Sequence, residues 1–194
     1  MTRQPNLLAV DWSKLPAPTD DGAMAHLAGA RLPPVALPAT DGSLVTLAAL
    51  PGRVVVFAYP MTGQPGVALP DGWDEIPGAR GCTPHSCAFR DHHAELIAAG
   101  AARVFGLSTQ ETGYQREAAE RLHLPFPLLS DDGLEFAKGA GLATIEVAGT
   151  TLIKRFALVI DDAVVTKVFY PVFPPDANAG DVLAWLIANP VRET

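Results

Sequence analysis

Apolar residues occur in this chain either as short unbroken runs or at helical spacing. The run RVVVFAYP, residues 53–60, is continuously apolar and β-branched, which is typical of a strand buried on both faces. From Cys82 or Thr83 to about Ala99, apolar residues recur every three or four positions, as on one stripe of a helix. A second apolar run follows at residues 102–109. These segments predict a strand, a helix and a second strand in succession.

The rest of the pattern predicts shorter elements on both sides of this unit. Residues 31–50 predict a hairpin that turns at TDGS, and residues 151–170 predict two strands around Asp161 and Asp162. Asp176 or Asn178 is expected to cap the closing helix, and Pro190 to end it. Three segments and the closing helix complete the prediction: a helix at 111–124, a short strand and turn at 126–132, a short helix at 133–141 and the last helix at 176–190.

This order of elements predicts the fold class. Strands that alternate with helices, joined by right-handed crossovers, imply a mostly parallel or mixed sheet with helices on both faces. The β-α-β unit followed by a β-hairpin and a helix is the order of the thioredoxin fold. We therefore expect an α/β, thioredoxin-like domain with a mixed central sheet, an N-terminal arm and a β-hairpin.

Two segments are expected to lie outside the regular layers. Residues 1–28 are rich in Pro and Asp and predict an irregular arm, which leaves residues 29–194 as the domain. Residues 61–80 are rich in Gly and Pro, and loops of this length are usually functional or disordered. With Trp73, this insertion is expected to form either a wall of a pocket or a surface for a partner.

Composition and charge narrow the classes of partner. Of the 194 residues, 48% are hydrophobic and 18% are charged, which is a globular composition. The formal net charge is −7 and Lys and Arg do not cluster, so nucleic acid and anionic membrane are not expected as partners. No apolar run has the length of a membrane span or of a signal peptide, so a cytoplasmic location is expected. Thiols are kept reduced there.

Both cysteines of the chain lie in GARGCTPHSCAFRDHH, residues 78–93. At the first turn of the predicted helix, Cys82 would meet unpaired backbone N–H groups and the positive end of the helix dipole, which favour the nucleophilic thiolate. Residues five apart on a regular helix have Cα atoms about 8–9 Å apart, whereas a disulfide needs less than about 7 Å. Cys82 and Cys87 can therefore form a disulfide only if the first turn unwinds.

The residues alone leave three interpretations of this pair open. The cysteines can be buried and inert, they can form a metal site with His85 and a later histidine, or they can be a redox switch. The chain has no CxxC, no Gly-rich phosphate loop, no GxSxG and no HExxH. The Asp131-Asp132 and Asp161-Asp162 pairs are expected at solvated turns.

The segment GCTPHSCAFRD resembles the active-site segment of the Q-type peroxiredoxins, also called bacterioferritin comigratory proteins. In that family a Gly-Cys-Thr-x-x-x-Cys run ends in Arg-Asp. Residues 33–60, 123–142 and the RFALVID segment at 155–161 also resemble the family. The resemblance therefore covers most of the chain outside the first 28 residues and the insertion.

The resemblance implies a thiol-dependent peroxidase of hydrogen peroxide and organic hydroperoxides that needs no bound cofactor. Cys82 would attack the peroxide and become a sulfenic acid, and Cys87 would condense with it to a disulfide. Arg155 would stabilise the thiolate and orient the peroxide. A dithiol reductant such as thioredoxin would reset the pair, and the chain would be a monomer or weak dimer.

One departure concerns a threonine. The family has a threonine three residues before the first cysteine, and this chain has Ala79 there. Pro60 and Thr62 can be the displaced Pro-Thr element, with Thr62 folding back to supply the hydroxyl; alternatively, Thr62 caps a turn. Two other functions stay open, namely a redox-sensing or binding module with little turnover and a metal-binding protein.

Overall fold

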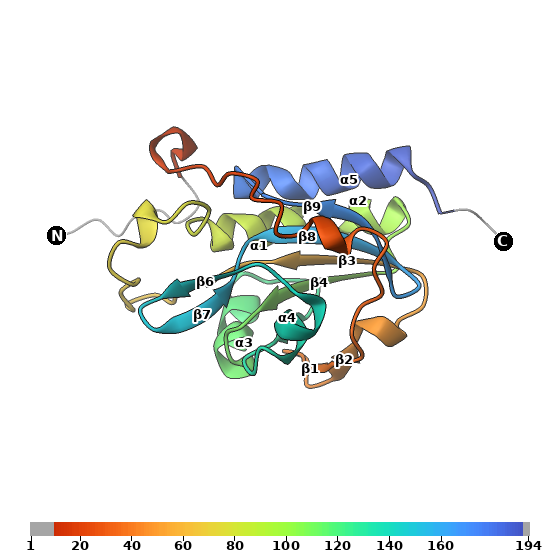
Figure 1. Ribbon diagram of the computed structural model, residues 1–194, viewed down its shortest axis with the longest axis horizontal. Coiled ribbons are helices and arrows are strands. Elements are labelled where there is room, and N and C mark those ends of the chain that lie inside the picture. Colours follow the sequence, from red (N-terminus) through yellow and green to blue (C-terminus); the bar gives the residue numbers. More distant parts are fainter. Residues whose placement is uncertain (1–9, 192–194) are drawn as a thin grey trace.

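The computed structural model describes residues 10–191 and contains a five-stranded mixed sheet (Figure 1). Its strand order is β5-β4-β3-β8-β9. The three strands β5, β4 and β3 run parallel, whereas β8 is antiparallel to both β3 and β9. The strands are β3 (Arg53–Ala58), β4 (Arg103–Ser108), β5 (Leu128–Ser130), β8 (Phe156–Asp161) and β9 (Val164–Phe169). This is the thioredoxin-like arrangement that the sequence predicts.

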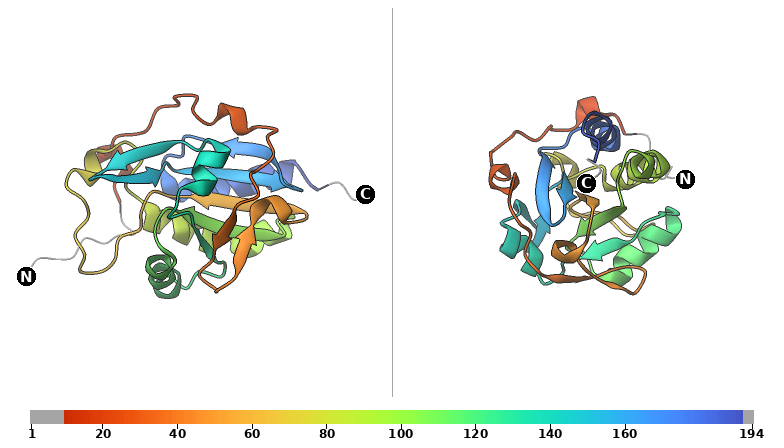
Figure 2. Two further views of the ribbon diagram at one scale, coloured as in Figure 1. Left: turned by 60° about the horizontal axis from the view of Figure 1, so that its bottom comes forward. Right: turned by 90° about the vertical axis from the view of Figure 1, so that its right-hand side faces the viewer.

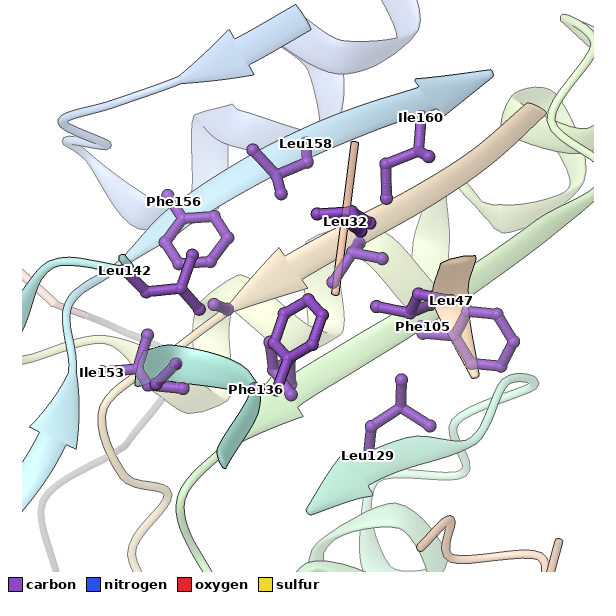
Figure 3. Close-up of a cluster of buried hydrophobic side chains, with 14 of the residues drawn as sticks. Leu32, Leu47, Phe105, Leu129, Phe136, Leu142, Ile153, Phe156, Leu158 and Ile160 are labelled. Atoms are coloured by element: carbon purple, nitrogen blue, oxygen red, sulfur yellow. The ribbon is translucent and has the colours of Figure 1, made fainter. Parts of the chain in front are cut away.

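The central strand β3 separates two hydrophobic cores. Alternate residues of a strand point to opposite faces of the sheet, and every residue of β3 is buried. Val54 and Val56 contribute to one core, which Figure 3 shows together with Phe136, whereas Val55 and Phe57 contribute to the other. The unbroken apolar run therefore has the physical cause expected of it: both faces of this strand are covered.

Helices supply these two covers (Figure 2). On the face of Phe57 pack α1 (Cys82–Asp91), α2 (His93–Ala98) and α5 (Asn178–Ala188). On the opposite face packs α4 (Glu135–Ala140) with the hairpin of β1 (Ala36–Pro38) and β2 (Leu44–Thr46), while α3 (Thr112–Arg121) lies beside β5. Short 3₁₀ helices complete the chain: η1 (Trp12–Lys14), η2 (Ala25–Leu27), η3 (Leu47–Ala49), η4 (Trp73–Glu75) and η5 (Pro175–Ala177).

The predicted arm packs closely on the domain. Its first nine residues lie outside the described range, and the remainder runs along the surface (Figure 1). Met24 and Leu27 are almost fully buried in the core of Phe136. Residues 10–28 are irregular apart from two short 3₁₀ helices, yet they contribute apolar side chains to the interior.

The single helix expected from Cys82 to Ala99 is divided in two. α1 ends at Asp91 and α2 begins at His93. Between them His92 adopts φ −93° and ψ 2°, and both its backbone N–H and its imidazole Nδ1 bond the carbonyl of Ala88. α1 therefore ends where the backbone of His92 departs from helical geometry, and apolar spacing does not predict this break.

The segment expected to hold two strands also differs. Residues 151–170 contain β7 (Thr150–Ile153), β8 and β9, because the chain leaves regular strand geometry at Lys154 and Arg155. β7 pairs with β6 (Thr144–Val147), which the sequence analysis did not assign. The turn between these strands is Ala148-Gly149, with φ of 48° and 78°, a two-residue hairpin turn of the kind that glycine favours. That dipeptide was the available sequence signal.

The turn after β8 lies one residue later than the predicted Asp161-Asp162, because Asp161 is the last residue of β8 and its carboxylate binds Arg53. The cap of α5 also differs from the prediction. Asp162 and Ala163 have positive φ between β8 and β9. Ala177 is the N-cap of α5 and makes no side-chain capping bond, while Asp176 and Asn178 bond other residues. Among residues 10–191, no helix is long and apolar enough to cross a membrane.

Candidate active site

α1 begins at Cys82, directly after a glycine that no other residue can replace without strain. Gly81 has φ 105°, in the region that side chains disfavour. A Cβ at this position would lie 2.6 Å from the ring of Trp12 and 2.8 Å from Pro175. The arm and η5 therefore pack against the start of α1, and the close approach fixes where the helix begins.

The sulfur of Cys82 lies in a buried and polar setting at this first turn. Cys82 is 4% exposed, and its sulfur is 3.2 Å from Nη2 of Arg155. The thiol also lies 3.6 Å from the carbonyl of Ala79. The guanidinium therefore donates a hydrogen bond to the sulfur and places a permanent positive charge beside it.

Arg155 reaches Cys82 from the break between β7 and β8, so the irregular backbone at this point positions a functional side chain. It is 4% exposed. Its Nη2 also donates to the carbonyls of Ala79 and Arg80 at 3.1 and 3.3 Å. Its Nε is buried and has no partner among the described residues. The guanidinium thus joins the loop before α1 to the central sheet.

Two further residues complete the site: His85, which the sequence suggested only as a metal ligand, and Asn178, which it suggested only as a helix cap. His85 is fully buried, with Nδ1 2.9 Å from Nη1 of Arg155 and Nε2 2.9 Å from Oδ1 of Asn178. Asn178 is the first residue of α5 and is 2% exposed. The sequence signal was a histidine three residues after Cys82 and hence on the same side of the helix, but nothing in it pointed to Asn178.

Cys87 lies on the same intact helix and its thiol is free, like that of Cys82. It is 6% exposed. Burial raises the pKa of the Cys87 thiol above its ordinary value, and Arg90 opposes this shift. Both thiols are free while α1 is intact, which agrees with the expectation that a disulfide between them requires the first turn to unwind.

The structure does not bring the hydroxyl of Thr62 to Cys82. Thr62 is 1% exposed; its Oγ1 donates to Oε1 of Gln110 at 3.1 Å and its backbone N–H donates to the same oxygen at 2.9 Å. The Thr62 carbonyl accepts from Gln110 and from Tyr114. No hydrogen bond joins Thr62 to Cys82 in residues 10–191. Its role as a donor to the peroxide stays a prediction.

A cavity of about 330 Å³ opens at Cys82. One wall is the start of α1 with Thr83 and Pro84, and the other is the insertion 61–80. The insertion contributes mostly apolar side chains, with Trp73 4% exposed. Arg80, which bonds Asp74 at 2.9 Å, is the charged side chain in the lining. The insertion therefore forms a pocket wall, the first of the two roles expected for it.

The site residues do not assemble as a metal centre. Among residues 10–191, no group of three or more His, Cys, Asp and Glu side chains could hold a metal ion. His85 uses one ring nitrogen on Arg155 and the other on Asn178, so neither is available as a ligand beside Cys82.

The expectation of a solvated turn at Asp131 is wrong. Asp131 is 3% exposed, and its two carboxylate oxygens accept from the backbone N–H groups of Phe136 and Ala137 at 3.0 and 2.7 Å. It therefore satisfies the N-terminus of α4, away from Cys82, while the adjacent Asp132 is exposed as expected.

Comparison with known proteins identifies the family. The Redoxin family model matches residues 27–183. The chloroplastic peroxiredoxin Q of Sedum lineare is 34% identical over 160 residues, which are 81% of this chain and 76% of the relative. That of Oryza sativa subsp. japonica is 32% identical over 156 residues, 80% of this chain and 64% of the rice protein, so the chain spans less than two thirds of that relative. The chain belongs to the redoxin family, among the relatives of peroxiredoxin Q.

Solved structures agree with this assignment. The peroxidoxin BcpB of Mycobacterium tuberculosis superposes with a TM-score of 0.68 at 30% identity, over 84% of this chain and 98% of that one. A Xanthomonas campestris peroxiredoxin Q structure has a TM-score of 0.66 at 23% identity, over 84% and 98% of the two chains, and supports the fold. The resemblance of this chain to the Q-type peroxiredoxins is thereby confirmed, and the thioredoxin-like fold with it.

Proposed function

We propose that this protein is a thiol-dependent peroxidase in which Cys82 is the peroxidatic cysteine and Cys87 the resolving cysteine. The observation that carries the proposal is the 3.2 Å contact between the Cys82 sulfur and Arg155 at the start of α1, beside a cavity. Membership of the redoxin family supports it. Each half of the cycle makes a separate demand on the residues around Cys82.

In the first half, the Cys82 thiolate attacks one peroxide oxygen. The S–O bond forms as the O–O bond breaks, so that Cys82 becomes a sulfenic acid and the other oxygen leaves as an alcohol, or as water from hydrogen peroxide, after taking up a proton. Arg155 carries a permanent charge next to the sulfur and keeps a buried Nε donor that has no partner among residues 10–191. Such a cation stabilises both the attacking thiolate and the negative charge that develops on the leaving oxygen.

In the second half, the Cys87 sulfur attacks the sulfenic sulfur and water leaves, which forms an intramolecular disulfide. Both cysteines are buried on one helix, five residues apart. The distance limit for a disulfide requires the first turn of α1 to open. Opening must break the contacts of His85 with Arg155 and Asn178, because His85 lies between the two cysteines.

A dithiol reductant of the thioredoxin type would then return both cysteines to thiols and itself become a disulfide. In this proposal the protein acts as a monomer or weak dimer in the cytoplasm, where reductants of this type keep thiols reduced. Its net charge of −7 supports the expectation that neither nucleic acid nor anionic membrane is a partner.

The cavity favours organic hydroperoxides with an apolar arm over hydrogen peroxide. Its volume of about 330 Å³ is within the range of small-molecule sites. Trp73 and Leu69 line it together with Met61. Burial of an apolar group against such a wall contributes roughly 25 cal/mol per Å², and hydrogen peroxide has no apolar surface to gain it.

A peroxide titration of the reduced protein tests this function. We expect one equivalent of peroxide to remove both free thiols in the wild type, and we expect Cys87→Ser to accumulate a single oxygen adduct on Cys82 by intact mass. Survival of both thiols for minutes in stoichiometric peroxide would overturn the proposal. Continued peroxide consumption with a thioredoxin system distinguishes an enzyme from the alternative, a redox-sensing switch with little turnover. One contact favours the redox-sensing alternative. Trp12 of the arm packs on Gly81, so opening α1 would move the arm and could signal the oxidation state of the cysteines.

A further inference from the structure

The buried histidine of α1 is placed between the functional arginine and the last helix. His85 lies edge-on to the rings of Phe57 and Phe89, with ring centroids 5.1 and 5.3 Å away. Aromatic packing therefore fixes the plane of the imidazole, and its two nitrogens point to Arg155 on one side and Asn178 on the other. A side chain confined in this way acts as a rigid spacer between them.

The contacts determine the protonation state of His85. A guanidinium only donates hydrogen bonds, so Nδ1 facing Nη1 of Arg155 must be the unprotonated acceptor. The proton is then on Nε2, which donates to Oδ1 of Asn178. Burial and the charge of Arg155 both lower the pKa of His85 well below its ordinary value. The imidazole is therefore neutral and in one tautomer.

This tautomer fixes the orientation of the guanidinium. Among residues 10–191, Nη1 of Arg155 has His85 as its hydrogen-bond partner. Nη2 of Arg155 donates to the Cys82 sulfur and to the carbonyls of Ala79 and Arg80. A guanidinium is planar, so anchoring Nη1 determines where Nη2 can point. Loss of the Nη1 acceptor would allow the plane to rotate away from the sulfur.

We propose that His85 and Asn178 are positioning residues for the peroxidase reaction: Asn178 selects the neutral Nε2–H tautomer of His85, which accepts from Arg155 and holds it on Cys82. The inference rests on the proposed roles of Arg155 and Cys82.

The surroundings of His85 make this arrangement sensitive to charge at position 178. Among residues 10–191, the titratable groups at the site are Arg155 from the β7–β8 junction, Cys82 from α1 and Tyr59, which directly follows β3 and whose pKa is raised by burial and by the charge of Cys82. β3 and α5 contribute Phe57 and Asn178, which are uncharged. A carboxylate in place of the amide would favour the doubly protonated imidazolium, and that cation could no longer accept from Arg155.

The experiment measures the second-order rate of Cys82 oxidation by peroxide from pH 5 to 9 in full-length variants. Because a misplaced catalytic group can cost about a hundredfold in rate, we expect His85→Leu to lower it by at least about tenfold. His85→Gln, which keeps an acceptor for Arg155 and a donor for Asn178, should stay within about threefold of wild type. The matched control is His93→Gln, a partly exposed histidine that packs on Phe126.

Asn178→Asp distinguishes a positioning role from a purely structural one, because only a positioning role predicts a changed pH dependence of the oxidation rate. We expect its rate to fall as the pH decreases through a new ionisation, with recovery toward wild type at high pH. A wild-type pH profile in Asn178→Asp, or a wild-type rate in His85→Leu, would overturn the inference. If His85→Leu does not fold, the Asn178→Asp profile still decides.

Arg155→Met separates the two proposals. If it loses the rate while His85→Leu and Asn178→Asp keep theirs, the positioning role fails and the peroxidase mechanism stands. If Arg155→Met retains the rate, the role of Arg155 and the positioning inference both fail.

Discussion

The ring of Trp12 lies against Gly81 so closely that no side chain fits between them. A Cβ on Gly81 would come within 2.6 Å of the indole, whose Nε1 is held by Asp176 at 2.9 Å. Trp12 also meets the ring of Phe173 edge-on, with centroids 6.1 Å apart. A residue near the N-terminus thus packs on the residue that precedes the proposed peroxidatic cysteine.

This relationship predicts a large cost for Gly81→Ala. The substitution combines a strained φ of 105° with two steric overlaps, and we expect the free energy of unfolding to fall by about 2–4 kcal/mol. Gly22→Ala is the matched control, because Gly22 has φ 71° with nothing within 4 Å of a Cβ. It should cost about 1 kcal/mol from backbone strain alone. Equal costs in chemical denaturation would show that the contact with Trp12 is unimportant.

Arg155→Lys tests the geometry of the guanidinium. Lysine keeps the charge but cannot bond His85, two carbonyls and the Cys82 sulfur at once. We expect the rate of peroxide reduction to fall by about 100-fold, comparable to the loss of one preorganised donor. Stopped-flow oxidation of Cys82 measures this directly. A rate within threefold of wild type would mean that charge alone suffices.

Trp73→Ala tests the wall of the cavity. We expect kcat/KM for an aromatic hydroperoxide such as cumene hydroperoxide to fall by about tenfold, since the loss of one large apolar contact costs on the order of 1–3 kcal/mol. The value for hydrogen peroxide should change by less than threefold. Trp185→Phe is the control, because Trp185 packs over Arg53 at the opposite end of β3. Parallel losses for both peroxides would instead indicate a structural role for Trp73.

Thr62→Val tests the donor that the sequence predicts. Because the Thr62 hydroxyl bonds Gln110 and not Cys82, we expect peroxide turnover to stay within about threefold of wild type. A loss of tenfold or more that Thr62→Ser restores would establish the hydroxyl as a donor in the reaction. Circular dichroism melting of both variants controls for loss of the Gln110 bond.

The two cysteines should react with iodoacetamide in a fixed order. Cys82 lines the cavity with Arg155 bonded to its sulfur, whereas burial raises the pKa of the Cys87 thiol. The folded protein at pH 7 should therefore be alkylated at Cys82 first. Since the Cys87 pKa is raised, its labelling should increase only as the pH rises beyond the ordinary thiol range of about 8.5. Peptide mass spectrometry measures both sites, and faster labelling of Cys87 at pH 7 would contradict the expectation.

The adjacent aspartates at the start of α4 offer a paired stability test. Asp131→Ala removes a buried acceptor from two backbone N–H groups, so we expect unfolding to become easier by about 2 kcal/mol. Asp132→Ala, at an exposed position, should change it by less than about 0.5 kcal/mol. Denaturant titration of both variants measures the difference, and similar values would refute the capping role.

The sequence by itself determined the layers of the sheet and the place of Cys82 at the start of a helix. The unbroken run of β3 has to be buried on both faces, and helical spacing after Cys82 has to place that thiol at a helix start; both follow from local periodicity. Local periodicity did not predict the break at His92 or the β6–β7 hairpin. A side-chain bond to one carbonyl and a two-residue turn hardly change the spacing of apolar residues.

Only the tertiary structure decided the partners of that thiol. Arg155 lies 73 positions from Cys82 in the chain and was expected beside it only from the family resemblance, whereas nothing in the sequence related Asn178 to His85, 93 positions away. Hydrogen bonds across the sheet and between α1 and α5 depend on which side chains the packed layers bring within about 3 Å. For the same reason the sequence predicted that the Thr62 hydroxyl lies at Cys82, whereas in the folded chain this hydroxyl donates to Gln110.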